Sequence, residues 1–237
     1  MIVGLCGQAG SGKSTAAQFL VRDHGFVEVA LADVLKRACK EFFQFTNEQL
    51  WGPSEKRNEP DKRYPRILPD GHTTWLTPRH ALQQLGTEFR RSTYPHIWIE
   101  YALRIAKTLL YKDYQRNQEI QRYDRVRGLY VPQQALGYTG HAEYDRLPAG
   151  VVISDCRFRE ELEVLRENGS SLWRIRRPGD TGLIGEAAQH ASETEQKQFS
   201  LELFDCCIEN GGSMEALSQV VDSSLAFTKT LLLAKQK

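Results

Sequence analysis

The sequence has little net charge, no long hydrophobic run and only five cysteines, and each of these shortages excludes a class of protein. Lysine and arginine total 31 against 30 acidic residues among 237, so overall charge gives no argument for binding nucleic acid or an anionic membrane. The longest apolar run near the C-terminus, 231–234, is far too short to cross a bilayer. No basic-then-apolar leader precedes the first expected strand, so we expect a cytoplasmic protein that does not bind membranes.

The cysteines exclude more than they indicate. They show neither C-x-x-C spacing nor a cysteine–histidine pattern typical of a metal site. Cys206 and Cys207 are adjacent and poorly placed to pair with each other, so free thiols in a reducing cytoplasm are the interpretation we favour. No internal repeat or linker composition is visible, and 237 residues suit a single domain, 1–237, with excursions.

What the sequence does contain is a phosphate-binding motif near its start. Residues 7–14 read G-x-x-x-x-G-K-[ST], between an apolar strand-like run and an amphipathic helix expected over 14–24. The glycines let successive backbone N–H groups point at phosphate oxygens, and the start of the helix adds donors and partial positive charge. Lys13 would bridge the β- and γ-phosphates, and the Ser14 hydroxyl would ligate Mg²⁺. We therefore expect ATP or GTP to be bound by Gly10, Ser11, Gly12, Lys13, Ser14 and Thr15.

Strand-like and helix-like stretches alternate along the rest of the chain. This alternation predicts an α/β fold with a central parallel sheet, right-handed crossovers and flanking helices. The strands after the first are expected at 26–31, 151–155, 171–176 and 203–208. Helices are expected at 14–24, 33–43, 78–93, 97–110, 156–168 and 213–232.

Three segments depart from this pattern. Residues 52–72 carry four prolines among many charges, which favours a solvated loop within an acceptor-side excursion over 44–78. Residues 111–149 hold six of the nine tyrosines among arginines, a mixture that could stack on single-stranded nucleic acid. The acidic residues mixed into it favour a solvated insertion or hairpin instead, with no stable nucleic-acid partner. Residues 179–200 have the polar composition of a mobile lid.

Charged side chains gather where the expected strands end. Asp155 closes one strand, and two arginines follow it within four residues. Phosphoryl transfer needs cations around the transferring group and Mg²⁺ held by carboxylate or hydroxyl oxygens. With Lys13, a positive cage could come from Arg157, Arg159, Arg176 and Arg177. The alternative for these arginines is surface salt bridging with glutamates such as Glu160 and Glu161.

Two further candidates start a helix at the same edge of the expected sheet. Asp33 and Lys36 lie in the first turn after the second strand, where open α/β sheets bind ligands. Asp33 fits a substrate-binding role and a helix-start carboxylate equally well. Trp98 lies on the apolar face of the helix expected over 97–110, and periodicity alone assigns it to the core.

These residues lie in stretches that resemble the bacteriophage-type deoxynucleoside monophosphate kinases. The matches occur in the family's order over about two thirds of the chain, and their combination is more specific than the phosphate-binding motif alone. They are GQAGSGKST at 7–15, VALADVLK at 29–36, PRHALQQLGTEFRRS at 78–92, Trp98, the stretch 151–179 from VVISD to RRPG, and HASE at 190–193.

The resemblance implies a three-layer P-loop nucleoside-kinase-like fold with a lid and acceptor-site excursions. It also implies Mg²⁺-dependent transfer of the γ-phosphoryl group of ATP to deoxynucleoside 5′-monophosphates, for DNA precursor synthesis, in the host cytoplasm if the protein is phage-encoded. Catalysis would then involve Lys13, Asp155 and Arg157, with Arg177 on the ATP side. The acceptor side would comprise Lys36, Arg79, Gln83, Gly86, Thr87, Trp98, Asp155, Arg157 and Glu161.

Within that resemblance, the expected roles follow from side-chain chemistry. Arg79 and Arg157 would clamp the acceptor phosphate, and Trp98 would stack on the base. Glu161 or Asp155 would bond to the sugar, to the base or to a Mg²⁺-bound water. Small-molecule substrates are thus the partners we expect, with a homodimer left open.

The chain also departs from the family's pattern. The stretch between Lys36 and Arg79 is shorter than in the best-known member, 111–149 is an insertion, and His80 replaces a more basic residue, so base specificity does not transfer. Two alternatives stay open: another small-molecule P-loop kinase of ribonucleotide or dephospho-coenzyme A type, and a P-loop ATPase that binds nucleic acid. Against the ATPase stand the balanced charge and the lack of a second ATPase motif with an Asp-Glu pair.

Overall fold

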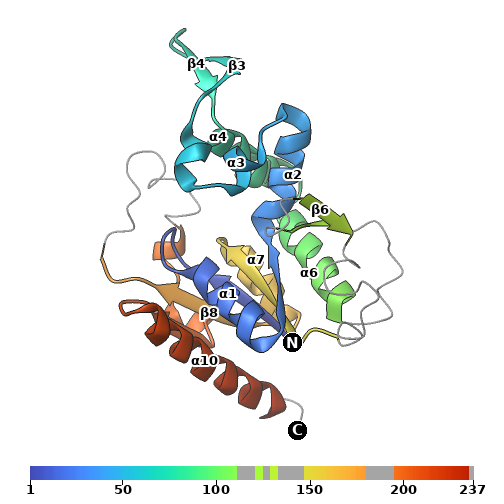
Figure 1. Ribbon diagram of the computed structural model, residues 1–237, viewed down its shortest axis with the longest axis vertical. Coiled ribbons are helices and arrows are strands. Elements are labelled where there is room, and N and C mark those ends of the chain that lie inside the picture. The colour runs from blue at the N-terminus through green and yellow to red at the C-terminus, as the bar shows by residue number, and fades with distance from the viewer. Residues whose placement is uncertain (111–120, 125–128, 133–146, 180–194, 235–237) are drawn as a thin grey trace. The chain divides into compact units, whose positions relative to one another are not determined.

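The computed structural model describes residues 1–110, 121–124, 129–132, 147–179 and 195–234. The chain divides into two compact units, which Figure 1 shows in ribbon form. Unit 1 comprises 1–31, 98–117 and 142–237, and unit 2 comprises 32–97 and 118–141. The single kinase domain stays a prediction, and its acceptor-side excursion, 44–78, falls within unit 2.

Unit 1 is built around a five-stranded parallel sheet, as the alternation of strands and helices predicted. The strand order is β2-β7-β1-β8-β9, and each neighbouring pair is parallel. The N-terminal strand lies in the middle of the sheet and is buried along its whole length, as expected of a strand covered on both faces. The strands are β1 (Ile2–Cys6), β2 (Phe26–Ala30), β7 (Gly150–Cys156), β8 (Ser171–Arg176) and β9 (Cys206–Glu209).

The last strand begins later than expected. The sequence predicted a strand over 203–208, but a short 3₁₀ turn, η6 (Leu201–Leu203), precedes it, and β9 starts at Cys206. The Ser200 side chain accepts the N–H of Glu202 and stabilises that turn. Local capping therefore outcompeted strand propensity over these residues.

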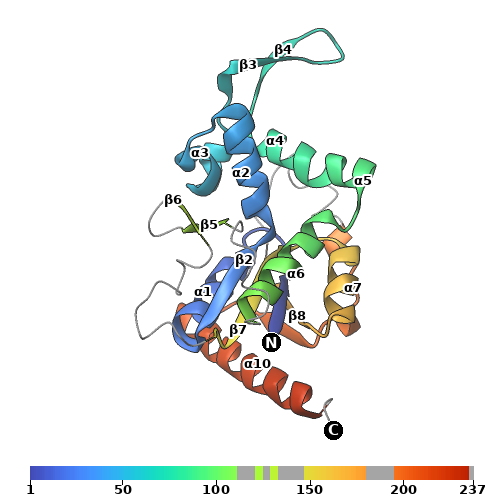
Figure 2. The same ribbon diagram turned by 90° about the vertical axis from the view of Figure 1, so that its right-hand side faces the viewer.

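Helices cover both faces of this sheet (Figures 1 and 2). On one face lie α1 (Lys13–His24) and α10 (Met214–Ala234), which share a buried cluster with the strands. On the other face lies α7 (Arg159–Glu167), with α6 (Ile97–Leu110) beside it in Figure 2. Gly4 of β1 faces α7, since a Cβ there would lie 2.6 Å from a methyl group of Leu165.

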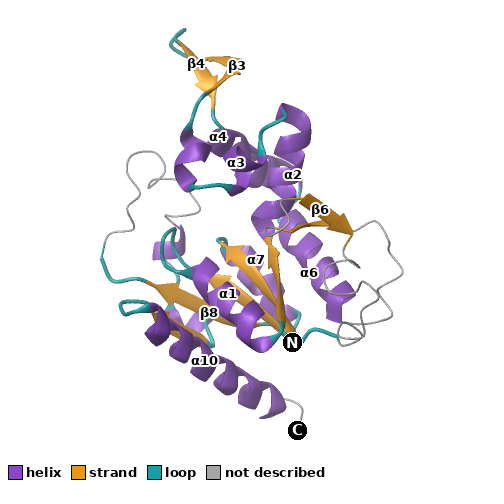
Figure 3. Cartoon of the chain, in the orientation of Figure 1, coloured by secondary structure: helices purple, strands orange, loops and turns teal. Residues whose placement is uncertain are grey.

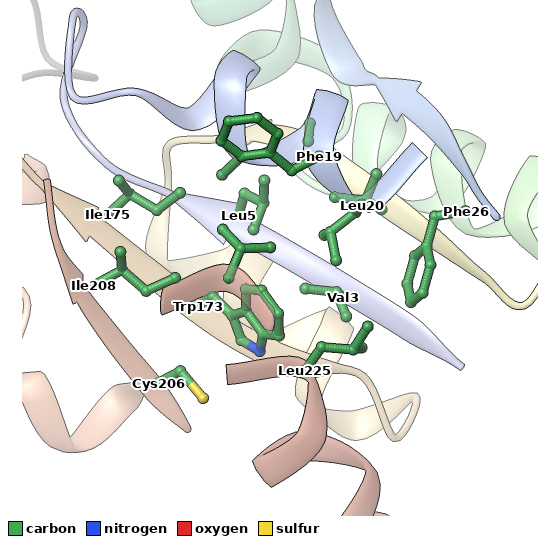
Figure 4. Close-up of a cluster of buried hydrophobic side chains, with 14 of the residues drawn as sticks. Val3, Leu5, Phe19, Leu20, Phe26, Trp173, Ile175, Cys206, Ile208 and Leu225 are labelled. Carbon is green, nitrogen blue, oxygen red and sulfur yellow. The ribbon is translucent and has the colours of Figure 1, made fainter. Parts of the chain in front are cut away.

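The buried cluster under α1 and α10 is the main core of unit 1. Figure 4 shows its side chains converging from the strands and from both helices. Trp173 of β8 is fully buried, and its indole N–H donates to the Thr228 hydroxyl of α10 at 3.0 Å, so its polar atom is satisfied. Burial of each large apolar side chain contributes about 1.5–3 kcal/mol, which holds the strand ends in place for the site.

The helix ends follow the signals in the sequence, with one correction. Gly25 ends α1 in a left-handed conformation, with φ of 68°, and the Ser213 hydroxyl accepts the N–H of Ala216 at the start of α10. The helix expected from residue 156 instead starts at Arg159, because Cys156 still pairs in the sheet.

Unit 2 is mainly helical and has a separate apolar core formed by Cys39, Phe45, Leu50, Leu76 and Ala81. Its described elements are α2 (Leu31–Phe43, with Leu31 assigned to unit 1), α3 (Asn47–Trp51), the 3₁₀ helix η1 (Ser54–Asn58), β3 (Asp61–Ile67), β4 (Thr73–Leu76), α4 (Pro78–Gln83), the π-helical segment η2 (Gln84–Phe89), α5 (Arg90–Thr93), β5 (Gln121–Asp124) and β6 (Leu129–Pro132).

The expectation of an irregular loop over 52–72 was wrong. This stretch contains η1 and then β3, which pairs antiparallel with β4 to form the ribbon drawn in Figure 3. Pro65 is tolerated because the ribbon has only two strands and its register shifts between Asp61 and Pro65. The turn closes through hydrogen bonds between Leu68 and His72 and between Gly71 and Leu68.

The helix expected over 78–93 is confirmed in position but is not uniform. Thr77 caps it by accepting the N–H of His80 at 3.1 Å, with Pro78 in the first turn, as predicted. Its middle, 84–89, has π-helical hydrogen bonding, and α5 completes it to Thr93. Such segments are frequent at functional sites, and this one carries Gly86 and Thr87.

The tyrosine-rich insertion contains a hairpin, in agreement with one of its expected forms. Strand β5 pairs antiparallel with β6. The rest of the 111–146 stretch, residues 180–194 of the expected lid, and the HASE motif lie outside the described residues. Among the helices of the described ranges, none is both long and apolar enough to cross a membrane.

Candidate functional site

The phosphate-binding loop connects β1 to α1 as the motif predicted. Gly7 closes the strand at a position where a side chain would collide with the carbonyl oxygen of Ile175 on β8. The Lys13 side chain is almost fully buried, and its ammonium donates to the carbonyl oxygens of Gly7 at 2.6 Å and Gln8 at 2.8 Å. The loop therefore surrounds a buried cation, which is the arrangement needed to receive phosphate oxygens.

The start of α1 presents the remaining groups of the motif. Gly12 precedes the helix with φ of 103°, a conformation that favours glycine. Ser14, in the first turn, is exposed, and its hydroxyl fits a ligand of Mg²⁺, which proteins usually hold by few side chains together with phosphates. Across the part of the chain that the structure describes, no group of three His, Cys, Asp or Glu side chains could itself hold a metal ion.

Asp155 lies in a β-bulge near the end of β7. Gly4 pairs with Ile153 while Cys6 pairs with Cys156, so β7 has one more residue than β1 over this step. Asp155 has φ of 67°, which is unusual for a residue other than glycine but tolerated by aspartate. Bulges re-aim side chains and are frequent beside active sites. Asp155 thus lies on a strand that pairs with β1, and β1 leads into the phosphate-binding loop.

The turn after Asp155 is held by Glu161. This carboxylate is buried, and its Oε2 accepts the backbone N–H groups of Arg157 at 2.8 Å and Phe158 at 3.1 Å. A glutamate in the first helical turn that bonds back to the preceding backbone stabilises the start of the helix. Glu161 therefore fixes the backbone that carries Arg157, and its contact with a substrate stays a prediction.

The other arginines of the expected cage have different surroundings. Arg159 pairs with Glu163 at 2.8 Å, and Arg176 pairs with Glu209 at 3.4 Å, both on the surface. Salt bridging, the alternative interpretation, therefore describes these two. Arg177 is exposed directly after β8.

Trp98, in the first turn of α6, is partly exposed, whereas Ile99 and Ala102 are buried. The core assignment from periodicity fits these two neighbours better than it fits Trp98. Trp98 is partly exposed as a residue although its indole nitrogen is buried, and the stacking role implied by the resemblance stays a prediction.

In unit 2, Asp33 and Lys36 form a cluster with a residue that the sequence analysis missed. The indole N–H of Trp51 donates to Asp33 Oδ1 at 3.0 Å. Lys36 Nζ lies 3.8 Å from the same oxygen and 5.7 Å from the centre of the Trp51 ring. Trp51 ends a short helix 18 residues beyond Asp33, and no local periodicity could have linked the two. Asp33 is therefore part of a side-chain cluster as well as of a helical first turn.

The Arg79 guanidinium is also held within unit 2. It donates to the Ser54 hydroxyl at 2.7 Å and to the Asn58 side-chain oxygen. Both partners come from η1, in the stretch expected to be a loop. The excursion thus positions a residue expected on the acceptor side, as the sequence analysis had allowed.

Three further acceptor-side candidates lie beyond Arg79 on the same helical stretch. Gln83 ends α4, while Gly86 and Thr87 lie in the π-helical segment. Thr87 is buried, and a Cβ on Gly86 would lie 3.0 Å from Leu35 of α2.

The predicted residues thus fall into two sets, one in each unit. The set in unit 1 comprises the phosphate-binding loop, Trp98, Asp155, Arg157, Glu161 and Arg177. The set in unit 2 comprises Asp33, Lys36, Arg79, Gln83, Gly86 and Thr87.

The Cys6 and Cys156 thiols, on neighbouring strands, are not suited to be nucleophiles. All five cysteines, which lie in the described ranges, are free, as expected. Burial raises the pKa of Cys6 to about 12, and burial also raises the pKa of Cys156, its partner in register on β7. Both thiols stay protonated at neutral pH, so they act as packing residues rather than nucleophiles.

The chain is similar to a viral protein over most of its length. No family model matches the sequence. Over 222 residues the chain is 32% identical to a protein of Acanthamoeba polyphaga mimivirus described as "Putative deoxynucleotide monophosphate kinase", covering 93% of this chain and 94% of that protein. Among solved structures it is similar to dephospho-CoA kinase from Campylobacter jejuni, with 14% identity, 95% of each chain covered and a TM-score of 0.44. TT1252 from Thermus thermophilus is similar with 19% identity, coverage of 95% of this chain and 96% of that one, and a TM-score of 0.39.

Proposed function

Because this chain belongs to the deoxynucleotide monophosphate kinase family, we propose that it transfers the γ-phosphoryl group of ATP to a deoxynucleoside 5′-monophosphate. The product would be a deoxynucleoside diphosphate, a precursor for DNA synthesis. The observation that carries the proposal is the loop between β1 and α1, in which the buried Lys13 ammonium is surrounded by backbone carbonyls.

On the ATP side, the chain offers a cation, backbone donors and a hydroxyl. Lys13 exchanges its bonds to the Gly7 and Gln8 carbonyls for bonds to phosphate oxygens, so charge develops beside a group that is already desolvated. The exposed Ser14 hydroxyl would hold Mg²⁺, which would neutralise phosphate charge when bound. Arg177 extends the positive charge at the end of β8.

On the acceptor side, the candidates are Asp155, near the end of β7, and Arg157, directly after that strand. The bulge rotates Asp155 out of the regular alternation of β7, and Glu161 fixes the backbone of Arg157. Arg157 would clamp the acceptor phosphate, and Asp155 would orient the acceptor. Positioning of this kind provides most of the catalysis in phosphoryl transfer, because the reacting oxygens must lie in line.

Unit 2 carries further residues that the family resemblance assigns to the acceptor. Arg79, held by Ser54 and Asn58, is suited to a second contact with the acceptor phosphate. Lys36 and Asp33 supply a charged pair beside the Trp51 ring. Trp98 of unit 1, which is partly exposed, would stack on the base.

The test is ADP release from ATP and Mg²⁺ by the full chain, with dAMP, dGMP, dCMP, dTMP and the matching ribonucleotides as acceptors. We expect release that depends on one or more of the deoxynucleotides. Release that is indifferent to every acceptor would contradict the proposal and favour an ATPase.

A pair of lysine variants links the activity to the loop. Lys13→Ala should lower the rate of transfer at least about 100-fold, because it removes a preorganised charge from the transferring phosphoryl group. Lys229→Ala, on the exposed side of α10, should leave the rate unchanged. Equal rates for the two variants would rule out the loop as the catalytic site.

A further inference from the structure

Asn210, directly after β9, is bonded to the phosphate-binding loop. Its side-chain Nδ2 donates to the carbonyl oxygen of Ser11 at 2.9 Å, across 199 residues of sequence. Its backbone N–H donates to the carbonyl oxygen of Arg176, at the end of β8, at 2.7 Å. The residue is buried, with 7% of its surface exposed. It therefore connects the ends of two strands with the loop.

The Asn210 carboxamide also fits against Gly12. A Cβ on Gly12 would collide with Asn210 Nδ2, and the next nearest side chain is Leu217 of α10. The absence of a side chain on Gly12 is thus matched by the position of Asn210. Two neighbouring residues of the loop, Ser11 and Gly12, are set by the same side chain.

This contact determines the direction of one backbone donor. Ser11 and Gly12 share a peptide unit, which is planar and trans, so its C=O and N–H point in opposite directions. Because the Ser11 carbonyl is directed at Asn210, the Gly12 N–H is directed away from Asn210. Backbone N–H groups of such a loop bind phosphate oxygens only when they point into it.

We propose that Asn210 is a positioning residue that orients the Ser11–Gly12 peptide unit for the triphosphate and so sets the affinity of the loop for ATP. This inference rests on the proposed function, since it assigns the residue to the ATP side of the same site. Asn210 bonds to the loop rather than to the acceptor residues, so it affects ATP and leaves use of the deoxynucleotide unchanged.

The variant that tests it is Asn210→Asp, which keeps the shape of the side chain but replaces the donor with a carboxylate oxygen. That oxygen faces the Ser11 carbonyl and repels it, so the peptide unit turns. Asn210→Ala removes the donor without adding charge and serves the same comparison if the first variant does not fold. Asn168→Ala is the matched control, because Asn168 also donates to a backbone carbonyl, that of Val164, at the end of α7.

The measurement is the Kd for ATP by calorimetry, together with the KM for each substrate and the unfolding temperature. We expect Asn210→Asp to weaken ATP binding about tenfold or more, because the Ser11 carbonyl loses its buried donor. The KM for the deoxynucleotide should stay within about twofold, and Asn168→Ala should bind ATP like the unmodified chain.

The two proposals fail in different ways. If the unmodified chain does not bind ATP, both the proposed function and this inference are wrong. If it binds ATP and Asn210→Asp binds equally well, only the inference is overturned. A variant whose KM values for both substrates rise together also overturns it, because a general structural role predicts that result.

Discussion

The carboxylate of Glu161 accepts the backbone N–H of Arg157, so one expected substrate-binding residue holds the turn that carries another. The bond is 2.8 Å long, and the glutamate is buried. One carboxylate oxygen of Glu161 is bonded to the protein backbone, so the two oxygens are not both left for a ligand. Its effect on the acceptor therefore passes at least partly through the position of Arg157.

Replacing Glu161 should thus affect both stability and acceptor use. Glu161→Ala leaves one buried and one part-buried N–H group without their acceptor, which should lower the free energy of unfolding by about 1–3 kcal/mol. The KM for the deoxynucleotide should rise while the Kd for ATP changes little. Chemical denaturation and steady-state kinetics provide the measurements. Glu163→Ala, which removes the surface partner of Arg159, is the control and should change stability by less than about 0.5 kcal/mol.

Asp155 can be tested for charge and for backbone conformation separately. Asp155→Asn keeps a side chain that tolerates positive φ, so the unfolding temperature should change little while transfer falls about 100-fold or more. Asp155→Val introduces a β-branched side chain at φ of 67°, which should lower stability by about 1–3 kcal/mol. Full activity in Asp155→Asn would show that the Asp155 carboxylate is not required for phosphoryl transfer.

Trp51→Phe should distinguish the contribution of the indole N–H from that of the aromatic ring. The substitution keeps an aromatic surface near Lys36 but removes the donor to Asp33, which is then held less firmly. We expect the KM for the deoxynucleotide to rise about three- to tenfold, the range that one hydrogen bond implies, with the KM for ATP unchanged. An unchanged KM for the deoxynucleotide would show that the cluster of Asp33, Lys36 and Trp51 does not contribute to acceptor binding.

Stability of unit 2 should depend on pH through Asp61. Hydrogen bonds from the Arg63 side chain lower the pKa of this carboxyl to about 2, against an ordinary value of 3.8. Because the folded-state pKa is depressed, the contribution to stability is present above about pH 4 and is lost as the pH falls towards 2. Unfolding monitored over this range should show the loss in the unmodified chain and a smaller slope in Asp61→Asn. Identical slopes would show that the pair with Arg63 is not the cause.

The parts of the fold that could be read from the sequence are those with local signals. The Gly-rich loop, the caps Thr77 and Ser213, and the 3.6-residue periodicity of α6 each depend on residues within one or two turns. The parallel sheet followed from the alternation of strands and helices. These features needed no knowledge of distant contacts.

The features that were missed depend on pairing across the chain. The four prolines among many charges in 52–72 predicted an irregular segment, whereas a two-stranded ribbon leaves an open edge that tolerates Pro65. Trp51 and Asn210 carry no periodic signal, and their roles come from partners 18 and 199 residues away. The bulge at Asp155 likewise arises from its register with β1.

The position of β1 in the middle of the sheet has a consequence for synthesis of the chain. Its two neighbours, β7 and β8, begin at residues 150 and 171, so β1 leaves the ribosome long before either of its partners is made. The Ser11 carbonyl waits longer still, until Asn210 has emerged. A nascent chain therefore carries an unpaired apolar strand while the residues between β1 and its partners are made, when such strands are prone to aggregate. Nucleotide can assist only after Asn210 has been made, because that residue completes the loop that binds it.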